Sequence, residues 1–348
     1  MRVVVAMSGG VDSSVAAGRL VEQGHDVIGV HLKLHDGPAG SGKTCCGLED
    51  ALDAREVAAA LGIPFYVWDM QTAFDAAVKR PFAEAYTQGL TPNPCVLCNG
   101  SLKFDLLWSR ARGLGAEKLA TGHYARVEDG RLYAATDKDK DQSYFLFPVR
   151  REVLDGLIFP LGGSTKAEVR ADAERMGLVT ASKPESQDVC FLPTHDHTGF
   201  VAARYPDLDG SGEIVDEAGA VLGRHSGYWR YTVGQRRGLG VAAAEPRYVL
   251  RVEPETRRVV IGPESALQHT ALRAIGVHWL RRPSADEAVT ARIRHRGALI
   301  PVDLTEAEGT HARMRFRAPA RAATPGQAVV LYADDEVLGG GWIREVER

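Results

Sequence analysis

Two groups of residues in this 348-residue chain have the types and spacing that chemistry requires: a glycine-containing turn near the start, and widely separated thiols. The turn, Ser8-Gly9-Gly10-Val11-Asp12-Ser13, follows three valines that are typical of a buried parallel strand. Its glycines let the backbone approach an anion, and a helix that starts there presents N–H groups to it. We expect Ser13 or Ser14 to cap this helix and Gly24 to end it. The sequence therefore predicts a phosphate cradle.

The spacing of the turn distinguishes it from other phosphate-binding loops. It fits neither Gly-x-x-x-x-Gly-Lys-Ser/Thr nor Gly-x-Gly-x-x-Gly. It resembles the PP-loop of the ATP pyrophosphatase family, in which the loop grips the pyrophosphate of ATP while a substrate carbonyl oxygen becomes adenylated. Asp12 can face phosphate-bound Mg²⁺, or it can simply complement the helix dipole.

The thiols suggest what happens to such an activated carbonyl. Cys95 and Cys98 form a Cys-x-x-Cys pair after Pro92 and Pro94, which predict a rigid, non-helical loop, and Cys190 lies much further along the chain. An adenylated carbonyl carbon is an electrophile, and a cysteine persulfide is a strong nucleophile. A second thiol can then break the sulfur–sulfur bond by disulfide exchange. The combination favours sulfur transfer over amide formation.

An alternation of strands and helices up to about residue 200 must position these groups. The expected strands are 26–30, 65–68 and 118–122, the expected helices are 48–61, 74–86 and 165–176, and a hairpin turn is expected at 128–131. This order predicts an α/β fold with a doubly wound parallel sheet. Ligands would then bind beyond the carboxyl ends of the strands, where Gly122 falls.

After about residue 205 the pattern becomes β-rich. Short strands are expected at 212–215, 248–252, 258–261, 291–296, 312–317, 328–332 and 341–346. We predict a PP-loop catalytic domain over 1–203, a small central β-rich domain over 204–271 and a C-terminal β-barrel over 272–348. Arg292, Arg294 and Arg296 would share one face of a strand, suited to phosphate contacts or to a solvated surface, and the basic turn 235–238 has the same two interpretations.

Composition limits the class of protein. The chain is 45% hydrophobic and 25% charged, and it contains no apolar run long enough to cross a membrane and no signal peptide, so a cytoplasmic protein is expected. Its five cysteines are expected to be reduced thiols rather than a disulfide framework. The net charge of −3 neither indicates nor excludes binding to nucleic acid.

Several motifs together resemble the bacterial tRNA-specific 2-thiouridylases (MnmA/TrmU family), over nearly the whole chain. Besides the PP-loop, the matching segments are 91–99, 120–124, 140–145, 188–191, 232–240, 293–296, 325–327 and 339–341. The resemblance implies ATP and Mg²⁺ as cofactors, and adenylation of C2 of the anticodon wobble uridine. Sulfur from a cysteine persulfide would then give 2-thiouridine, AMP and pyrophosphate. The implied partners are tRNAs of the Glu, Gln and Lys species and a persulfide donor such as a cysteine desulfurase or relay protein, with no membrane.

The resemblance also implies roles for individual residues. Cys98 would be the first catalytic cysteine, and Cys190 would carry the persulfide. The ATP site would comprise Ala6, Met7, Ser8, Gly9, Gly10, Val11, Asp12, Ser13, Leu32 and Gly122. The target base and the rest of the tRNA would contact Asn93, Pro94, Cys95, His123, Lys140, Asp141, Gln142, Arg294, His295 and Gln327.

Cys95 departs from the family pattern, because many relatives carry aspartate there. The change removes a carboxylate near the uracil and adds a third thiol to Cys98 and Cys190, so an iron–sulfur cluster is a further hypothesis. Cys45 and Cys46, in the glycine-rich stretch 37–47, are interpreted as incidental thiols.

Two rival functions remain open at this stage. One is a PP-loop amide ligase, although no glutaminase pattern is found and Arg2, not cysteine, follows the first methionine. The other is a non-catalytic module that binds tRNA or a nucleotide.

Overall fold

The computed structural model of the chain describes residues 1–35, 47–185, 189–192 and 196–348. Cys45 and Cys46 lie outside the described residues. The chain divides into two compact units: Met1–Val78, Cys95–His195 and Asp335–Leu338 form the first, and Lys79–Pro94, Asp196–Asp334 and Gly339–Arg348 form the second. The three domain boundaries expected from sequence stay a prediction.

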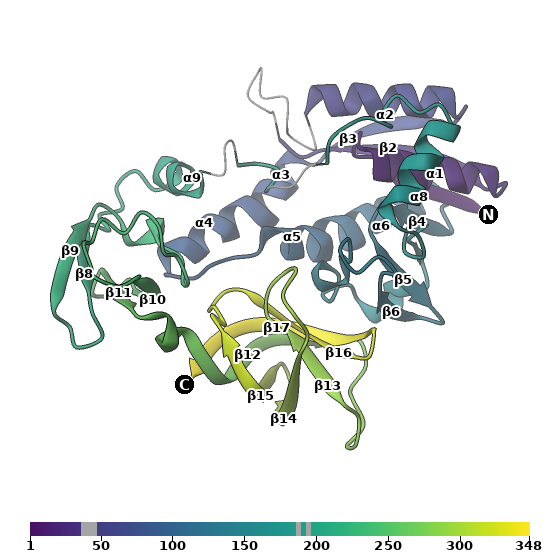
Figure 1. Ribbon diagram of the computed structural model, residues 1–348. Coiled ribbons are helices and arrows are strands. Elements are labelled where there is room, and N and C mark those ends of the chain that lie inside the picture. The colour runs from purple at the N-terminus through teal and green to yellow at the C-terminus, as the bar shows by residue number, and fades with distance from the viewer. Residues whose placement is uncertain (36–46, 186–188, 193–195) are drawn as a thin grey trace. The chain divides into compact units, whose positions relative to one another are not determined.

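A five-stranded parallel sheet organises the first unit, as the sequence predicts. Its order is β3-β2-β1-β4-β7, with β1 in the middle; Figure 1 labels β2, β3 and β4. The strands are β1 (Arg2–Ala6), β2 (Asp26–Lys33), β3 (Phe65–Asp69), β4 (Lys118–Thr121) and β7 (Leu157–Ile158). Val3, Val4 and Val5 of β1 are fully buried, because helices cover both faces of a parallel sheet. The carboxyl ends of β1, β2 and β4 meet at one edge, where Ala6 pairs with both Val30 and Thr121.

The helices of the first unit follow the strands in alternation. They are α1 (Val11–Glu22), α2 (Leu48–Ala60), α3 (Gln71–Phe74), a π-helical segment η1 (Asp75–Lys79), α5 (Pro94–Leu97), a second π-helical segment η2 (Cys98–Leu107), α6 (Trp108–Gly113), α7 (Arg151–Leu154) and α8 (Lys166–Arg175). The hairpin β5 (Ala125–Glu128) and β6 (Arg131–Ala134) turns where it was expected, and a short 3₁₀ turn, η3 (Ser143–Phe145), follows it.

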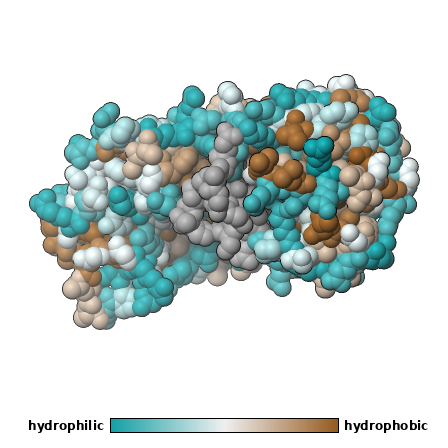
Figure 2. Space-filling model, turned by 90° about the horizontal axis from the view of Figure 1, so that it is seen from above, coloured by the Kyte–Doolittle hydropathy of each residue, from teal (hydrophilic) through white to brown (hydrophobic). Residues whose placement is uncertain are grey.

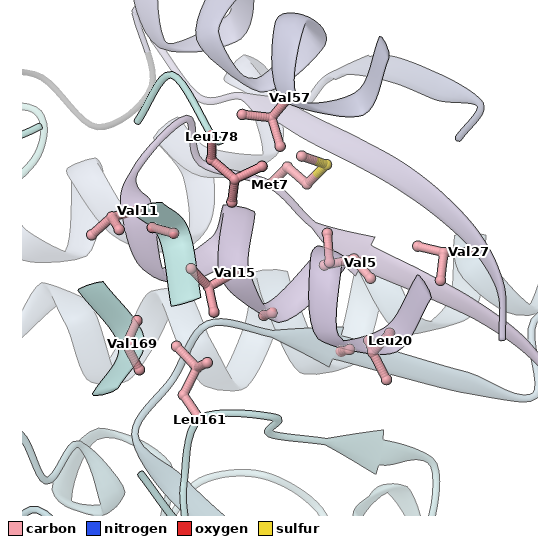
Figure 3. Close-up of a cluster of buried hydrophobic side chains, with 14 of the residues drawn as sticks. Val5, Met7, Val11, Val15, Leu20, Val27, Val57, Leu161, Val169 and Leu178 are labelled. Atoms are coloured by element: carbon pink, nitrogen blue, oxygen red, sulfur yellow. The ribbon is translucent and has the colours of Figure 1, made fainter. Parts of the chain in front are cut away.

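The core of this unit lies where α1 and α8 pack beside β1. Figure 3 shows Val5 and Met7 of the central strand segment with Val15 and Leu20 of α1 and Val169 of α8. Each of these five side chains is at most 1% exposed. Burying a side chain of this size contributes about 1.5–3 kcal/mol. This packing fixes the start of α1 against the end of β1, which is where the glycine turn lies.

Three local expectations are wrong. Gly10, not Ser13 or Ser14, is the N-cap of α1, and it has no side chain to cap the helix. The stretch expected as one helix over 74–86 is divided into α3, η1 and α4 (Arg80–Thr87). Pro94 begins a helix instead of lying in a non-helical loop, because proline is compatible with the first helical position.

The second unit contains α4, α9 (His197–Arg204) and two β-structures (Figure 1). A four-stranded sheet of order β10-β11-β8-β9 is formed by β8 (Gly212–Val215), β9 (Val221–His225), β10 (Tyr248–Glu253) and β11 (Arg258–Gly262), with a 3₁₀ turn at η5 (Tyr228–Arg230). Only β11 and β8 pair in parallel among these strands.

After the turn η6 (Glu264–Leu267), a barrel completes the second unit. Its order is β12-β15-β14-β13-β16-β17, and β12 also pairs with β17, which closes it. The strands are β12 (Gln268–Trp279), β13 (Val289–Arg292), β14 (Ile300–Glu308), β15 (His311–Arg321), β16 (Ala328–Ala333) and β17 (Glu336–Glu347). Asp335–Leu338 belong to the first unit, where Glu336 pairs with Tyr133.

The expected stripe of three arginines on one strand is wrong. β13 ends at Arg292, and Arg294 and Arg296 lie in the turn that follows, where Arg296 has a positive φ of 59°. The guanidinium of Arg292 instead lies over the ring of Tyr332, at 5.3 Å from its centroid.

Apolar residues on the surface are dispersed. On the face shown in Figure 2, hydrophobic residues form separate small groups among hydrophilic ones. Within the described ranges, no helix is long and apolar enough to cross a membrane.

Candidate phosphate and thiol site

The glycine turn forms a tight, self-bonded loop after β1. The backbone N–H of Ser8 donates to Ser13 Oγ at 3.0 Å, and the hydroxyls of Ser13 and Ser14 donate to the Gly10 carbonyl at 3.1 and 2.9 Å. Gly9 has a φ of +76°, and a Cβ there would lie 2.2 Å from the carbonyl oxygen of Asp50. Only glycine fits this position, because both the dihedral angle and the space exclude a side chain. The bonds within the loop and the lack of space at Gly9 therefore fix the backbone at the start of α1, where a helix can bind an anion.

The other residues expected at the ATP site lie at the same edge of the sheet. A Cβ on Gly122, just after β4, would lie 2.7 Å from the backbone N of Ser13, so β4 ends directly against the start of α1. Next to the loop, the ring Nδ1 of His31 donates to the Met7 carbonyl at 2.9 Å, and the neighbouring Leu32 is buried. Strand ends of this kind are where doubly wound sheets bind ligands.

Two lysines that sequence reasoning missed lie at this loop. Lys166 Nζ donates to both carboxylate oxygens of Asp12, at 2.7 and 2.9 Å, and Asp12 Oδ1 also accepts the hydroxyl of Tyr124 at 2.9 Å. Lys183 Nζ donates to the Gly9 carbonyl at 3.0 Å and to Asp50 at 2.7 Å, and it also pairs with Asp53.

The local environment keeps these groups in defined protonation states. Burial would lower the pKa of Lys183, but its hydrogen bonds to Asp50 and Asp53 outweigh burial and the pKa is raised. Burial, together with the negative charge of Asp12, raises the pKa of Tyr124, so its hydroxyl remains a donor. The sequence contains one sign of this role for Lys166, which is the first residue of α8. A cation at the start of a helix interacts unfavourably with the helix dipole, so a lysine there indicates that an anion lies nearby.

The described thiols lie in different environments. Cys98 is buried at the start of η2, Cys190 is half-buried, and Cys95 is exposed. Burial raises the pKa of the Cys98 thiol, while the positive charge of Lys103 partly opposes this rise. Phe191, next to Cys190, packs edge-on against Phe74 with ring centroids 5.6 Å apart. A π-helical segment is rare and is found frequently at functional sites, which fits the position of Cys98.

None of the cysteines that the structure describes takes part in a disulfide. Within the same described part of the chain, no three His, Cys, Asp or Glu side chains are grouped so as to hold a metal ion. Cys95, Cys98 and Cys190 therefore do not form a cluster site in this structure, and the iron–sulfur hypothesis gains no support from their arrangement.

Comparison with known proteins matches three consecutive segments of the chain to family models. Residues 1–194 match a family model described as a tRNA methyl transferase HUP domain, 198–263 a tRNA methyl transferase PRC-barrel domain, and 269–343 an aminomethyltransferase beta-barrel domain. A protein named tRNA-specific 2-thiouridylase MnmA from Geobacter metallireducens is 49% identical over 98% of this chain and 96% of its own length. A protein of the same name from Acidothermus cellulolyticus is 46% identical over 100% of this chain and 99% of its own length.

The chain belongs to the family of tRNA-specific 2-thiouridylases. A solved 4-thiouridine synthetase–RNA complex with bound ATP is a far weaker match, with a TM-score of 0.37 and 17% identity over 55% of this chain and 44% of that one. So low a score supports no conclusion.

In this 2-thiouridylase-family chain, the segment before Cys95 is held by the barrel turn that contains Gln327. Gln327 Nε2 donates to the carbonyls of Thr91 and Pro92, at 2.9 and 3.3 Å, and the Thr91 N–H donates to the Pro325 carbonyl at 3.0 Å. Asn93 is buried immediately after this contact. The amide of Gln327, expected to contact tRNA, thus fixes the backbone that leads to the Cys-x-x-Cys pair.

The other predicted RNA contacts of the first unit are strongly bonded within the protein. The carboxylate of Asp141 is 2% exposed and accepts the backbone N–H groups of Ala135 and Ser143, both at 3.1 Å. Gln142 exchanges hydrogen bonds with the backbone of Tyr124, and Lys140 pairs with Glu185 at 2.7 Å. These bonds organise the turn in this family member, and contact with RNA stays a prediction for all three side chains.

His123 is a neutral ring in this site. Its Nδ1 lies 2.7 Å from Thr121 Oγ1, and its ring packs against those of Phe104 and Phe159, at centroid distances of 5.8 and 6.0 Å. Burial, together with the charge of Lys103, holds the pKa of His123 well below its ordinary value. The family's expected RNA contact through His123 would therefore be a hydrogen bond rather than an ion pair.

The remaining candidates lie in the second unit. Arg294 is exposed and His295 half-buried, both in the turn after β13. The basic turn 235–238 is held by a hydrogen bond from Gln235 Nε2 to the Arg237 carbonyl at 2.9 Å. It borders a hollow of about 490 Å³ whose lining includes Arg236 and Arg247. Such side chains suit phosphate contacts, although no structural feature here assigns RNA to them.

Proposed function

We propose that this chain is a tRNA sulfurtransferase that converts the anticodon wobble uridine of tRNA to 2-thiouridine at the expense of ATP. One observation carries the proposal beyond family membership: the anion cradle at residues 8–13, Cys98 and Cys190 all belong to the same compact unit. A site with an anion cradle and two thiols can activate a carbonyl by adenylation and then attack it with sulfur.

In the first step, O2 of the uracil attacks the α-phosphorus of ATP and pyrophosphate leaves. Backbone N–H groups at the start of α1 can donate hydrogen bonds to the departing pyrophosphate, and the ammonium groups of Lys166 and Lys183, each paired with carboxylates, lie beside them. The donor set at Asp12 fits Mg²⁺, because a carboxylate is a hard oxygen ligand. Bound Mg²⁺ would supply charge neutralisation of the phosphates.

In the second step, the terminal sulfur of a persulfide on Cys190 attacks the adenylated C2, and AMP leaves. Cys98 acts as the second thiol in one of two ways. After the C–S bond has formed, its thiolate attacks the Cys190 sulfur of the C2–S–S–Cys190 adduct and frees the 2-thiouridine; alternatively, it attacks the persulfide first and releases hydrosulfide, which then attacks C2 in place of the persulfide. Both routes leave a Cys98–Cys190 disulfide, so an external reductant and a new persulfide donor are needed for each turnover.

We also propose the finer assignments. The substrates are tRNAs of the Glu, Gln and Lys species, and the sulfur comes from a cysteine desulfurase or a relay protein. The base would lie against Asn93, Pro94 and Cys95 and would enter from the anticodon loop, where unpaired bases can be splayed out. An iron–sulfur cluster is the alternative to the persulfide, and anaerobically purified protein without iron but with full activity would eliminate it.

The test is a reconstitution with unmodified tRNA, MgATP and a persulfide donor. We expect 2-thiouridine, AMP and pyrophosphate in equal amounts from the wild type, and loss of 2-thiouridine by at least about 1,000-fold in Cys98→Ser and Cys190→Ser, as for removal of a nucleophile. Undiminished turnover by Cys190→Ser would favour an amide ligase. Binding of tRNA without release of pyrophosphate would indicate a non-catalytic module.

A further inference from the structure

The Cys-x-x-Cys pair lies at the start of one continuous helical segment. Helix α5 (Pro94–Leu97) runs directly into η2 (Cys98–Leu107), and Leu97 between the two cysteines has helical dihedral angles, with φ at −61° and ψ at −44°. Helix geometry places Cα atoms three residues apart at about 5 Å, inside the range of roughly 4.4–6.8 Å that a disulfide spans. The backbone positions of Cys95 and Cys98 are therefore ones that a disulfide can join.

The place of the pair within the helix also favours the small adjustment that such a bond requires. The Cβ atoms of residues three apart on a helix are about 5–6 Å apart, whereas a disulfide holds them at roughly 3.5–4.5 Å. Cys95 lies in the first turn of the segment. The N–H groups of a first turn have no partner within the helix, so this turn has fewer hydrogen bonds to lose than a turn in the middle.

The two thiols differ in exposure, because the helix packs one side into the interior of the first unit. Val96 is 1% exposed and Cys98 is 8% exposed, whereas Cys95 is exposed. The residue after the inner thiol is also held in place, since Asn99 Nδ2 donates to the Phe145 carbonyl at 3.3 Å. The pair thus combines an outer thiol that a molecule in solution can reach with an inner thiol that is largely shielded.

This difference matters for the disulfide that the proposed reaction leaves behind. That bond joins Cys98 to Cys190 and must be reduced before the next turnover. The rate of thiol–disulfide exchange depends on access to the sulfur that is attacked, and burial limits access to Cys98. A thiol one helical turn away needs no encounter through solution, because its reaction is unimolecular.

We propose that Cys95 is a resolving thiol, which takes over the disulfide from Cys190 and presents it to reductant at the protein surface. The inference rests on the proposed function, which forms the Cys98–Cys190 bond. The Cys95 thiolate attacks the sulfur of Cys98, so the Cys95–Cys98 bond forms and the Cys98–Cys190 bond breaks. Cys190 leaves as a thiolate, ready for a new persulfide sulfur, and the exchange changes no net oxidation state.

An external thiol then completes the cycle at the exposed position. It attacks the sulfur of Cys95, and Cys98 leaves as a thiolate and takes up a proton, which burial favours because it raises the pKa of this thiol. A second external thiol attacks the mixed disulfide on Cys95 and restores its thiol. Two external thiols thereby become one external disulfide, and they supply the two electrons that the protein disulfide consumes.

The first experiment asks whether the pair forms a disulfide without substrate. The full chain carries Cys45→Ser and Cys46→Ser, so that three of its five cysteines remain. It is equilibrated with mixtures of reduced and oxidised glutathione, quenched with acid, treated with N-ethylmaleimide and digested with trypsin. No lysine or arginine lies between positions 81 and 102, so one peptide contains both thiols of the pair and loses two hydrogens when they join.

The pair should oxidise as a unit that does not need Cys190. We expect the disulfide in the parent chain and equally in Cys190→Ser. At the glutathione mixture that oxidises half of the pair, Cys98 in Cys95→Ser should be at least about 10-fold less oxidised, because it has lost the high effective concentration of its neighbour. Ser101→Ala changes an exposed residue of the same segment and is the matched control, which should oxidise as the parent chain does.

The second experiment asks whether the outer thiol serves successive turnovers. Formation of 2-thiouridine is followed with tRNA, MgATP, a persulfide donor and glutathione, and the rate of later turnovers is divided by the rate of the first. This ratio is the appropriate measure, because Cys95 is also proposed to contact the base and its replacement can alter every turnover. We expect the ratio to fall about 10-fold in Cys95→Ser and to recover with dithiothreitol, which is a small dithiol.

Each result bears on the inference. It is overturned if the pair stays reduced in mixtures that join glutathione to Cys98, or if the ratio of rates is the same in Cys95→Ser and the parent chain. If Cys95→Ser unfolds, as thermal melting would show, oxidation of the parent chain and of Cys190→Ser still decides it. Glutathione oxidation involves neither tRNA nor ATP. Failure to form 2-thiouridine with a normal pair disulfide would therefore count against the proposed function alone.

Discussion

The phosphate end and the thiol end of the first unit are built in different ways. The phosphate loop is held by bonds within residues 8–14 and by glycines pressed against backbone atoms. The thiols are placed by packing between parts of the chain: Cys98 is buried, and Phe191, next to Cys190, packs against Phe74. The contrast shows that contacts close in the sequence, together with glycines, shape the phosphate loop. The surroundings of the thiols are set by contacts between distant parts of the chain.

The largest effect is expected at Gly122, where the backbone at the start of α1 leaves no room for a side chain. Gly122→Ala would place a Cβ 2.7 Å from the backbone of Ser13 and displace the start of α1. We expect binding of an ATP analogue, measured by calorimetry, to weaken about 100-fold, equivalent to roughly 3 kcal/mol. Gly113→Ala is the control, because its Cβ would meet nothing within 4 Å. Equal affinities in the two variants would contradict a pre-built phosphate loop.

A smaller effect is expected at Lys166, which pairs with Asp12 of the phosphate loop and with Glu185. Lys166→Met leaves Asp12 and Glu185 without their shared cation. Affinity for MgATP should fall about 10- to 30-fold, as for the loss of one partly buried charged partner. Lys138→Met, an exposed lysine of the same unit, should bind as the wild type does. If Lys166→Met binds MgATP more tightly than the wild type does, the lysine serves only to neutralise the charge of Asp12.

A further test concerns the approach to the thiol end. Gln327→Glu replaces a donor by a carboxylate beside the carbonyls of Thr91 and Pro92, which lose their hydrogen bonds. Unsatisfied groups of this kind cost about 1–3 kcal/mol, and we expect about a 10-fold loss in kcat/KM for tRNA with little change in the KM for ATP. Gln268→Glu, on an exposed position of β12, serves as the control. An increase in the KM for ATP would argue against the separation of the two ends.

The smallest effect concerns the acidity of Cys98. Burial raises the pKa of this thiol and the charge of Lys103 lowers it, so Lys103→Met should raise it further. The thiolate is the reactive species, and its fraction falls at a given pH when the pKa rises. The pH profile for alkylation of Cys98 should therefore move to higher pH, with a few-fold slower reaction at pH 8. An unchanged profile, equal to that of Lys138→Met, would show that Lys103 does not influence the thiol.

Much of the fold was accessible from the sequence because its signals are local. Three valines followed by a glycine turn fix a central strand and the start of α1, and Thr165 with Glu168 forms the capping box that begins α8. Four of the six barrel strands were located, but β12 and β14 were missed, β13 is shorter than expected, and the arginines after it lie in a turn. Periodicity indicates that a strand exists far better than it indicates where it ends.

The sequence by itself determined the chemistry that is available: a phosphate cradle, whose shape needs only glycines and a helix start, and thiols of defined spacing. The tertiary structure alone decided which charges surround them. Lys166 and Lys183 reach the loop from positions 154 and 174 residues away from Asp12 and Gly9. The pairing of Lys166 comes from α8 and that of Lys183 from the segment after α8, and neither has a local pattern. The free energy of an ion pair depends on distance and burial in space, and neither quantity is encoded by spacing along the chain.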